Sequence, residues 1–377
     1  MAGDAGPVGP ADATVVPRFA GPATFARLPA AGAVPRWDIA LVGIPFDGGT
    51  TYRPGARFGP SAVRQGSRLL RPYNPAVGAL PFELAQVVDA GDIACTPFGT
   101  EEAVTQIEAA AEALLAGGGR LVAIGGDHTV ALPLLRATSA RHGPLALVHF
   151  DAHLDTWDVY FGQRFTHGSP FRRAWEEGLL SRDHCTHVGL RGPLYSSTDL
   201  VDDAGMGFAQ ITADDVAERG AAGVAALVLE RVGDAPLYVS VDIDVLDPAH
   251  APGTGTPEAG GLTSRELLSL VRGLAPARIV GADVVEYNPV RDVSGLTATV
   301  AAKILKELLG VMVRERPHLL RAMARTPSAR SRSARSRRSA SPRRTPVVAN
   351  TASRVLMVSA VTRWGIAAAA WTRAVTS

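Results

Sequence analysis

Short apolar runs alternate along the chain with longer segments in which apolar residues recur at the spacing of an amphipathic helix. The runs predict buried strands at residues 38–43, 120–124, 145–150, 237–241 and 278–285. The longer segments predict helices at residues 101–115 and 294–314, and a further helix runs through Arg136. Thr263 and Glu266 predict a capping box that opens another helix. This alternation favours an α/β fold in which a doubly wound parallel sheet carries helices on both faces, giving three layers.

Residue composition divides the chain into three parts. Residues 1–35 are rich in Pro, Gly and Ala, which predicts an irregular arm. Residues 36–320 hold the predicted strands and helices. Nine arginines and no acidic residue lie between Arg325 and Arg354, so residues 321–377 have the composition of a low-complexity, disordered tail.

The formal net charge of +2 hides this uneven distribution. Without the nine tail arginines the rest of the chain sums to 2 − 9 = −7, so the part with the predicted sheet is acidic. An acidic domain does not favour a nucleic acid as partner, because binding to phosphates depends on basic side chains.

Neither a membrane span nor an export signal is expected. The apolar runs, such as residues 145–150, fall far short of the roughly 18 residues that a spanning helix needs. The N-terminus lacks the basic flank and apolar stretch of a secretory signal, so a cytoplasmic protein is expected. Cys95 and Cys185 make no disulfide framework in so long a chain, and both are expected to be buried free thiols.

Six potential metal ligands follow three of the predicted strands. They are His128, then Asp151, His153 and Asp155, then Asp242 and Asp244. Side chains alternate between the two faces of a strand, so residues spaced by two can point to the same side. Ligands of parallel α/β sheets bind beyond the carboxyl ends of the strands, which is where these residues fall. The alternative is a set of strand-end caps and surface ion pairs, which does not explain six such residues at one edge.

Four carboxylates packed together repel one another and resist ionisation unless cations compensate their charge. Two divalent ions would add four positive charges against the four aspartates, and two neutral imidazoles would complete the ligand shell. A site rich in oxygen, with some imidazole and no thiolate, suits Mn²⁺, whereas structural zinc sites favour Cys and His. Zinc, cobalt or nickel remains an alternative in vitro, because raw affinity favours these ions.

Three segments resemble the signature blocks of the ureohydrolase family, which includes arginases and agmatinases. They are residues 125–129 (GGDHT), 150–155 (FDAHLD) and 240–248 (SVDIDVLDP). Residues 52–60 (YRPGARFGP) and 167–173 (HGSPFRR) place the resemblance in the agmatinase-like branch, beside guanidinobutyrases and proclavaminate amidinohydrolases. The resemblance covers roughly residues 36–316 and implies an arginase-like fold, a catalytic domain over 36–320 and a homotrimer or homohexamer.

The resemblance also implies a ligand set for two Mn²⁺ ions per subunit. One ion would take His128, Asp151, Asp155 and Asp242, and the other would take Asp151, His153, Asp242 and Asp244. Paired metals lower the pKa of a water and supply hydroxide near neutral pH, for attack on the carbon of a guanidinium.

Two further residues resemble catalytic groups of the family. Glu286 resembles the glutamate that holds the guanidinium by paired hydrogen bonds, and a carboxylate matches that fork; an ion pair with Arg291 is the structural alternative. His167 resembles the mobile histidine that passes a proton to the leaving amine, a task that suits a pKa of about 6.5. His149 is expected to be a core histidine and not a ligand, and His187 belongs to no motif.

The residues that follow the third aspartate bear on the choice of substrate. Arginases carry an Asn two residues after the third aspartate, where this chain has Trp157, so arginine is disfavoured and agmatine, which yields putrescine and urea, is favoured. Trp157, Asp158 and Tyr160 would line the entrance. A carboxylated substrate such as 4-guanidinobutyrate, or guanidinopropionate, stays open, since Arg164 or Arg172 could pair with a carboxylate.

Two alternatives lie outside this activity. A single-metal, deacetylase-like hydrolase on a related fold would not need all six ligands. An inactive family member acting as a binding partner would not need both His167 and Glu286.

Overall fold

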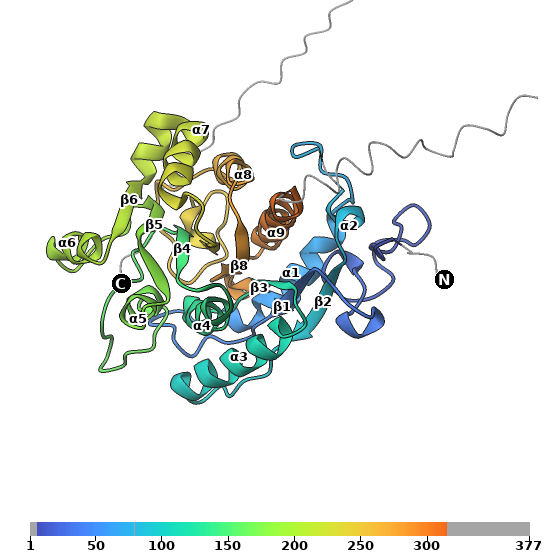
Figure 1. The fold of residues 1–377 in the computed structure, drawn as a ribbon, viewed down its shortest axis with the longest axis horizontal. Helices are drawn as coiled ribbons and strands as arrows, with labels where there is room; N and C mark the ends of the chain where they lie inside the picture. Colours follow the sequence, from blue (N-terminus) through green and yellow to red (C-terminus); the bar gives the residue numbers. More distant parts are fainter. Residues whose placement is uncertain (1–5, 79, 315–377) are drawn as a thin grey trace, which may run out of the picture. The chain divides into compact units, whose positions relative to one another are not determined.

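Eight parallel strands form the central sheet of the computed structural model, which describes residues 6–78 and 80–314 (Figure 1). They are β1 (Ile39–Gly43), β2 (Val87–Asp92), β3 (Arg120–Ile124), β4 (Leu145–Phe150), β5 (Leu180–Leu190), β6 (Phe208–Thr212), β7 (Leu237–Asp242) and β8 (Ile279–Val285). Their order across the sheet is β2-β1-β3-β8-β7-β4-β5-β6. Every pairing is parallel, so the carboxyl ends of all eight strands lie along one edge.

Helices cover both faces of this sheet. They are α1 (Gly59–Gly66), α2 (Pro81–Leu84), α3 (Thr100–Leu115), α4 (Ala131–His142), α5 (Pro170–Glu176), α6 (Thr198–Gly205), α7 (Ala213–Val232), α8 (Ser264–Gly273) and α9 (Leu296–Arg314). One apolar core joins the sheet to α1, α7, α8 and α9, and a second joins it to α3, α4 and α5. Figure 1 shows α7, α8 and α9 on one side of the strands and α3, α4 and α5 on the other. The predicted three-layer α/β fold with a parallel sheet is confirmed.

The five predicted strands are present, with their ends shifted by at most one residue. The helix predicted through Arg136 continues to His142, and the Thr263–Glu266 capping box opens α8. The pattern missed β2, β5 and β6. These strands carry polar or half-exposed residues, and β2 and β6 lie at the two edges of the sheet, where one continuous apolar run is not needed.

Residues 6–35 have little regular structure apart from short turns at Phe25–Arg27 and Ala31–Ala33. Phe25 and Leu28 are fully buried and anchor this arm in the core. The Arg27 guanidinium donates to the carbonyl oxygens of Val16 and Ala11, which holds the arm against itself. The predicted tail at 321–377 lies outside the described residues.

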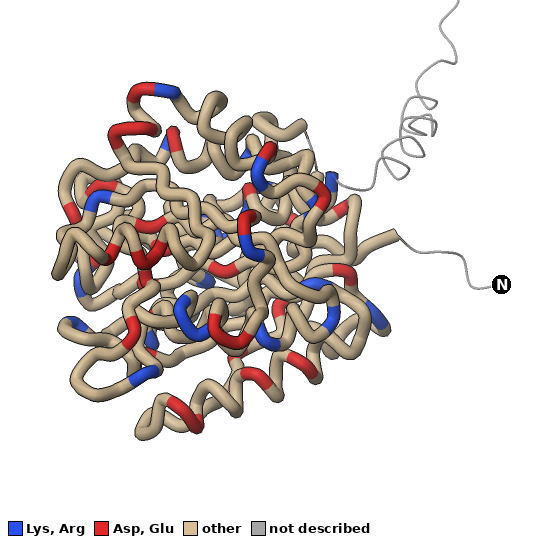
Figure 2. Tube along the Cα trace, turned by 60° about the vertical axis from the view of Figure 1, so that its left-hand side comes forward, with Lys and Arg blue, Asp and Glu red and all other residues tan. Residues whose placement is uncertain are grey.

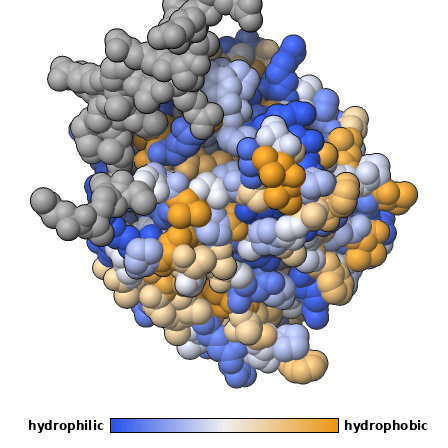
Figure 3. Space-filling view, turned by 90° about the vertical axis from the view of Figure 1, so that its right-hand side faces the viewer, coloured by the Kyte–Doolittle hydropathy of each residue, from blue (hydrophilic) through white to orange (hydrophobic). Residues whose placement is uncertain are grey.

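Charged and apolar surface residues are mixed. Basic and acidic positions are interspersed along the described trace in Figure 2, and small hydrophobic areas lie between hydrophilic ones on the face in Figure 3. Within the described residues, no helix is long and apolar enough to cross a membrane. Both cysteines are free, as predicted, but only Cys185 is buried; Cys95 is half-buried, which corrects the expectation for that thiol.

A buried ion-pair cluster ties α8 and α9 together. Glu307 is fully buried on α9 and accepts hydrogen bonds from Arg272 on α8, at 2.9 and 3.1 Å, and from Asn74, at 2.8 Å. Lys303 lies 2.7 Å from the same carboxylate. Burial opposes ionisation, but these partners outweigh it and lower the pKa of Glu307 to about 2.

Glu307→Gln should therefore lower the free energy of unfolding by about 3 kcal/mol, because two cations lose their buried partner. The expected result is a Tm roughly 5–10 °C lower at pH 7. Because the folded pKa lies below the usual value of about 4.3, the contribution is complete above that pH and is lost as pH falls towards 2. Glu112→Gln, at an exposed position on α3, is the matched control. Equal melting temperatures for the two variants would contradict the prediction.

Candidate metal centre

Three of four adjacent strands deliver the candidate ligands to one edge of the sheet. His128 opens a 3-10 turn (His128–Val130) just after β3, and Asp151 directly follows β4. Asp242 is the last residue of β7, and Asp244 lies in the next 3-10 turn (Ile243–Val245). Since β3, β8, β7 and β4 are neighbours in the sheet, their ends converge.

The first ligand group gathers around His128. Its Nδ1 atom lies 2.9 Å from Asp155 Oδ2, 3.3 Å from Asp151 Oδ2 and 3.4 Å from Asp242 Oδ2. His128 and Asp151 are fully buried, and the other two carboxylates are nearly so. The structure thus brings together the four residues predicted for one metal ion.

The second group gathers around His153. Its Nδ1 atom lies 3.2 Å from Asp244 Oδ2 and 3.3 Å from Asp151 Oδ1. Asp151 therefore belongs to both groups, with one oxygen towards each. Backbone amides fix the other carboxylate oxygens of Asp242 and Asp244, because Asp244 N donates to Asp242 Oδ1 at 2.8 Å and Ala152 N donates to Asp244 Oδ1 at 3.2 Å.

The predicted reason for this convergence is wrong in one respect. Asp151, His153 and Asp155 were expected to share a side through strand alternation, but β4 ends at Phe150 and the three residues lie in irregular backbone. Asp155 has a left-handed backbone conformation, with φ of 54°. The turn sends Asp155 to His128 and His153 to Asp244, so the loop distributes the ligands over two groups.

Gly126, in the turn before His128, allows a close approach of two backbone segments. A Cβ atom at Gly126 would lie 1.6 Å from the carbonyl oxygen of Phe46. No other residue type fits there without moving the loop after β1, which carries one wall of the site.

A buried hydrogen-bond chain fixes the orientation of His128. Its Nε2 atom lies 2.9 Å from Ser240 Oγ, and Ser240 Oγ donates to Asp283 Oδ1 at 2.6 Å. Since the hydroxyl proton goes to the carboxylate, the hydroxyl oxygen accepts from Nε2–H. The Nδ1 lone pair of a neutral His128 is then directed at the three carboxylates, as a metal ligand requires.

The chemistry of these groups fits bound cations. His128 Nδ1 is buried and makes no well-formed hydrogen bond with the surrounding oxygens, despite their proximity. Burial, followed by repulsion from Asp244 and Asp151, raises the pKa of Asp242 well above its usual range. Burial and Asp151 likewise raise the pKa of Asp244 to about 6. Positive charge between the carboxylates would remove this repulsion.

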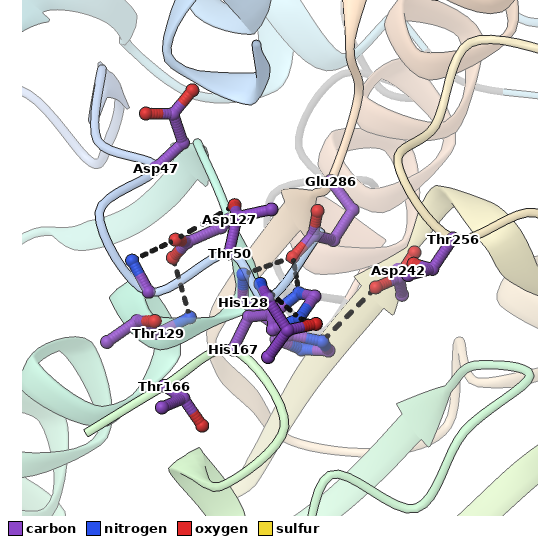
Figure 4. Close-up of polar contacts among 12 residues, drawn as sticks. Asp47, Thr50, Asp127, His128, Thr129, Thr166, His167, Asp242, Thr256 and Glu286 are labelled. Carbon is purple, nitrogen blue, oxygen red and sulfur yellow. Dashed lines mark hydrogen bonds and ion pairs between the residues drawn. The ribbon is translucent and has the colours of Figure 1, made fainter. Parts of the chain in front are cut away.

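His167 and Glu286 lie beside the first group (Figure 4). Glu286 follows β8 in a left-handed conformation, with φ of 61°, and is nearly fully buried. Its Oε1 atom accepts from His128 N at 2.8 Å and contacts His167 Nδ1 at 2.9 Å. The expected alternative, an ion pair with Arg291, does not form; Glu286 pairs with His167.

Thr51, in the loop after β1, contacts the second ring nitrogen of His167. When the His167 ring is neutral, Thr51 N donates to its Nε2 atom at 3.1 Å, and Nδ1 carries the proton given to Glu286. Burial opposes a charge on the ring, but Glu286 and then Asp127 outweigh it and raise the pKa of His167 to about 9. Cations held by the neighbouring carboxylates would lower that pKa again.

A pocket opens onto both ligand groups. His153, Asp155, Asp242 and His167 line its floor, and its walls consist of Thr51, Trp157, Tyr160, Gly168, Pro193, Leu194, Tyr195, Thr256 and Glu258. The rings of Trp157, Tyr160 and Tyr195 stand edge to face, each pair 5.9 Å apart. Glu258 is the acidic residue of the wall that belongs to neither ligand group.

Three residues expected near the entrance lie elsewhere. Asp158 is not part of the pocket lining; its carboxylate pairs with Arg173. Arg164 and Arg172 both pair with Glu176, and neither lines the pocket. No pattern of residues pointed to Thr51 or Tyr195, which come from loops far from the ligand motifs.

Comparisons with known proteins agree on one family. The model described as "Arginase family" matches residues 37–310. Guanidinopropionase of Pseudomonas aeruginosa is 46% identical over 301 residues, which are 80% of this chain and 94% of that protein. Mitochondrial agmatinase of Gallus gallus is 40% identical over 303 residues, 80% of this chain and 89% of that protein. The solved structure of proclavaminate amidinohydrolase from Streptomyces clavuligerus superposes with a TM-score of 0.76 at 44% identity, covering 79% of this chain and 99% of that one.

Proposed function

Because this chain belongs to the arginase family, we propose that it hydrolyses a guanidino compound to urea and an amine at a pair of bound Mn²⁺ ions. Two ligand groups that share Asp151 are the observation that carries the proposal. His128, Asp151, Asp155 and Asp242 would hold one ion, and Asp151, His153, Asp242 and Asp244 the other. Such a pair supplies Lewis acidity and lowers the pKa of water.

Hydrolysis adds water across one carbon–nitrogen bond. The water oxygen bonds to the guanidinium carbon, the bond from that carbon to the alkylamine nitrogen breaks, and both water protons end on this nitrogen, which leaves as an alkylammonium ion. The products are urea and an amine. A guanidinium is a poor electrophile, so the protein must hold it within reach of the attacking oxygen and stabilise the tetrahedral intermediate that forms on attack.

Glu286 is the proposed guanidinium holder. The hydrogen bonds that it makes among the described residues both use Oε1, which leaves Oε2 for an N–H of the substrate. His167 is the proposed proton carrier. It lines the pocket floor beside Glu286, and its ring can pass a proton to the leaving nitrogen.

Agmatine is the substrate that the pocket chemistry favours. The lining contains three aromatic rings and Glu258 but, among the described residues, no Lys or Arg that could bind a substrate carboxylate. Aromatic faces and a carboxylate attract a second cation at the far end of the substrate. The guanidino acids named in the relatives, guanidinopropionate and guanidinobutyrate, are the second candidates, because those relatives are at least as similar to this chain as the agmatinase.

The rate of urea release from four candidate substrates tests which of them the protein prefers. Mn²⁺-loaded protein should hydrolyse agmatine with a higher kcat/KM than 4-guanidinobutyrate, 3-guanidinopropionate or arginine. Glu258→Gln should raise KM for agmatine by about tenfold, because one charge-assisted contact is worth roughly 1.5 kcal/mol. The same variant should leave or improve KM for the guanidino acids. A wild-type preference for a guanidino acid would reject the agmatine proposal while leaving the ureohydrolase proposal intact.

The two alternatives to a ureohydrolase predict different experimental results. A single-metal, deacetylase-like hydrolase would bind one ion per chain and release no urea. An inactive binding partner would bind the substrate without turnover. Metal content and urea release on the same sample distinguish both from the proposed function.

A further inference from the structure

A row of polar residues crosses the sheet one layer beneath the metal ligands. It runs over five adjacent strands, from β8 to β6, through residues that are direct partners in the strand register: Asp283, Ser240, His149, His187 and Gln210. The four from Asp283 to His187 are fully buried. Asp151 and Asp242 come two residues after His149 and Ser240, at the ends of β4 and β7, so the row lies directly behind them.

Two members of this row, His149 and His187, belong to a continuous chain of hydrogen bonds that begins at Asp151. His149 Nε2 lies 2.8 Å from Asp151 Oδ2, and His149 Nδ1 lies 2.7 Å from His187 Nδ1. His187 Nε2 lies 3.0 Å from Oδ1 of Asp203, which comes from α6. All four side chains are fully buried, so water does not substitute for any of these partners.

The number of hydrogen bonds determines the number of protons. Three contacts join two carboxylates through two imidazoles, and each hydrogen bond needs one proton. Two neutral imidazoles carry only two ring protons. The chain therefore holds a third proton, either on one ring or on one carboxylate.

The surroundings locate this proton on His187. Thr156 Oγ1 donates to Asp203 Oδ1 at 2.7 Å, and Gln210 Nε2 donates to Oδ2 at 2.8 Å, so Asp203 is an acceptor. Burial opposes its ionisation, but His187 and these donors hold the pKa of Asp203 below its usual value. Asp151 must be ionised to bind metal. His149 then donates through Nε2, accepts through Nδ1 and is neutral, and His187 carries both ring protons.

We propose that His187 is a positioning residue for the metal-binding carboxylate of Asp151, and that it acts through His149. By donating its Nδ1–H to His149, His187 forces the tautomer in which His149 donates to Asp151. The opposite tautomer would turn a nitrogen lone pair towards the carboxylate oxygen and repel it. Asp203 keeps the second ring proton on His187. The inference rests on the proposed metal role of Asp151.

The first test measures the affinity of each Mn²⁺ ion by chelator competition. His187→Phe keeps a ring against Phe208, on which His187 stacks at 4.5 Å, but removes the donor. At least one Mn²⁺ should bind about tenfold more weakly, as happens when a partner of a metal ligand is lost. Thr186→Val is the matched control, because Thr186 is equally buried on the next position of β5 and its hydroxyl has no hydrogen-bond partner.

The second test counts ring protons by ¹⁵N NMR of labelled histidines in protein loaded with Zn²⁺, a diamagnetic ion that keeps Asp151 ionised. Wild-type His187 should carry protons on both nitrogens, and His149 on Nε2 only. In Asp203→Asn the amide can donate to His187 Nε2, so that nitrogen should lose its proton. His187 would still donate to His149, and Mn²⁺ affinity should stay near the wild-type value.

The results of these tests distinguish a failure of the inference about His187 from a failure of the proposed function. A single ring proton on wild-type His187, or folded His187→Phe that binds both ions as tightly as Thr186→Val, overturns the inference. If His187→Phe does not fold, the proton counts in wild type and Asp203→Asn decide. Wild-type protein that binds fewer than two Mn²⁺ ions rejects the proposed function together with the inference, which is a different result.

Discussion

Asp151→Asn should abolish urea release and reduce the bound Mn²⁺ to fewer than two ions per chain. Asp151 presents one oxygen to the His128 group and the other to the His153 group, so no other residue in the described site replaces it. An asparagine keeps the shape but loses the charge and one acceptor. Losing several kcal/mol of charge stabilisation corresponds to a fall in kcat of roughly 10³–10⁴.

Metal content by elemental analysis and urea release measure this effect, and melting temperature separates metal binding from folding. Added Mn²⁺ should raise the Tm of the wild type, because a ligand that binds only the folded state stabilises it. Asp151→Asn should lose most of that rise. Asp242→Asn should lose it too, without a lower metal-free Tm, because it removes a carboxylate that Asp244 and Asp151 repel.

Arg337→Ala, in the arginine-rich segment outside the described residues, is the control for both measurements. The proposed map gives this arginine no part in catalysis, so metal content and urea release should equal those of the wild type. Equal losses in Asp151→Asn and Arg337→Ala would mean that the assignment of the site is wrong.

Local patterns predicted those parts of the site that depend on single strand ends. The apolar run before Asp151 gave the end of β4, and the run before Asp242 gave the end of β7, to within one residue. Since parallel strands end at one edge, the two motifs had to approach each other. The loop that separates His153 from Asp155 could not be predicted, because the left-handed conformation of Asp155 depends on tertiary contacts.

The pocket walls were harder to predict for a related reason. Trp157 and Tyr160 lie close to a ligand motif in the chain and were found, whereas Thr51 and Tyr195 come from separate loops without a periodic pattern. Asp158 was expected to line the entrance because of its neighbours, but its side chain turns to Arg173. Sequence proximity does not determine which way a loop side chain points.

The histidine chain behind Asp151 shows why register matters. His149 was expected to be a core residue, and His187 was given no role, because β5 carries Asp183 and His184 and was not predicted as a strand. Only the pairing of β4 with β5 brings His149 beside His187, and only α6 adds Asp203. Such contacts across strands leave no spacing signal in the sequence.

His167→Asn should lower kcat by roughly 10²–10⁴, the usual loss when a proton-transferring group is removed, and should leave two Mn²⁺ ions bound. The ring contacts Glu286 and Thr51 but belongs to neither ligand group, so metal binding does not depend on it. His142→Asn is the matched control. His142 ends α4, at the opposite edge of the sheet from the site, and its replacement should leave kcat unchanged.

A second substrate distinguishes proton transfer from a purely structural role of His167. An N-(2,2,2-trifluoroethyl) guanidine releases a much less basic amine than agmatine does, so its departure depends less on an added proton. If His167 protonates the leaving nitrogen, the loss of kcat in His167→Asn should be clearly smaller for this substrate than for agmatine. If His167 only orients Glu286, kcat/KM should fall equally for both substrates and mainly through a higher KM, because a guanidinium held less firmly by Glu286 binds more weakly in each case.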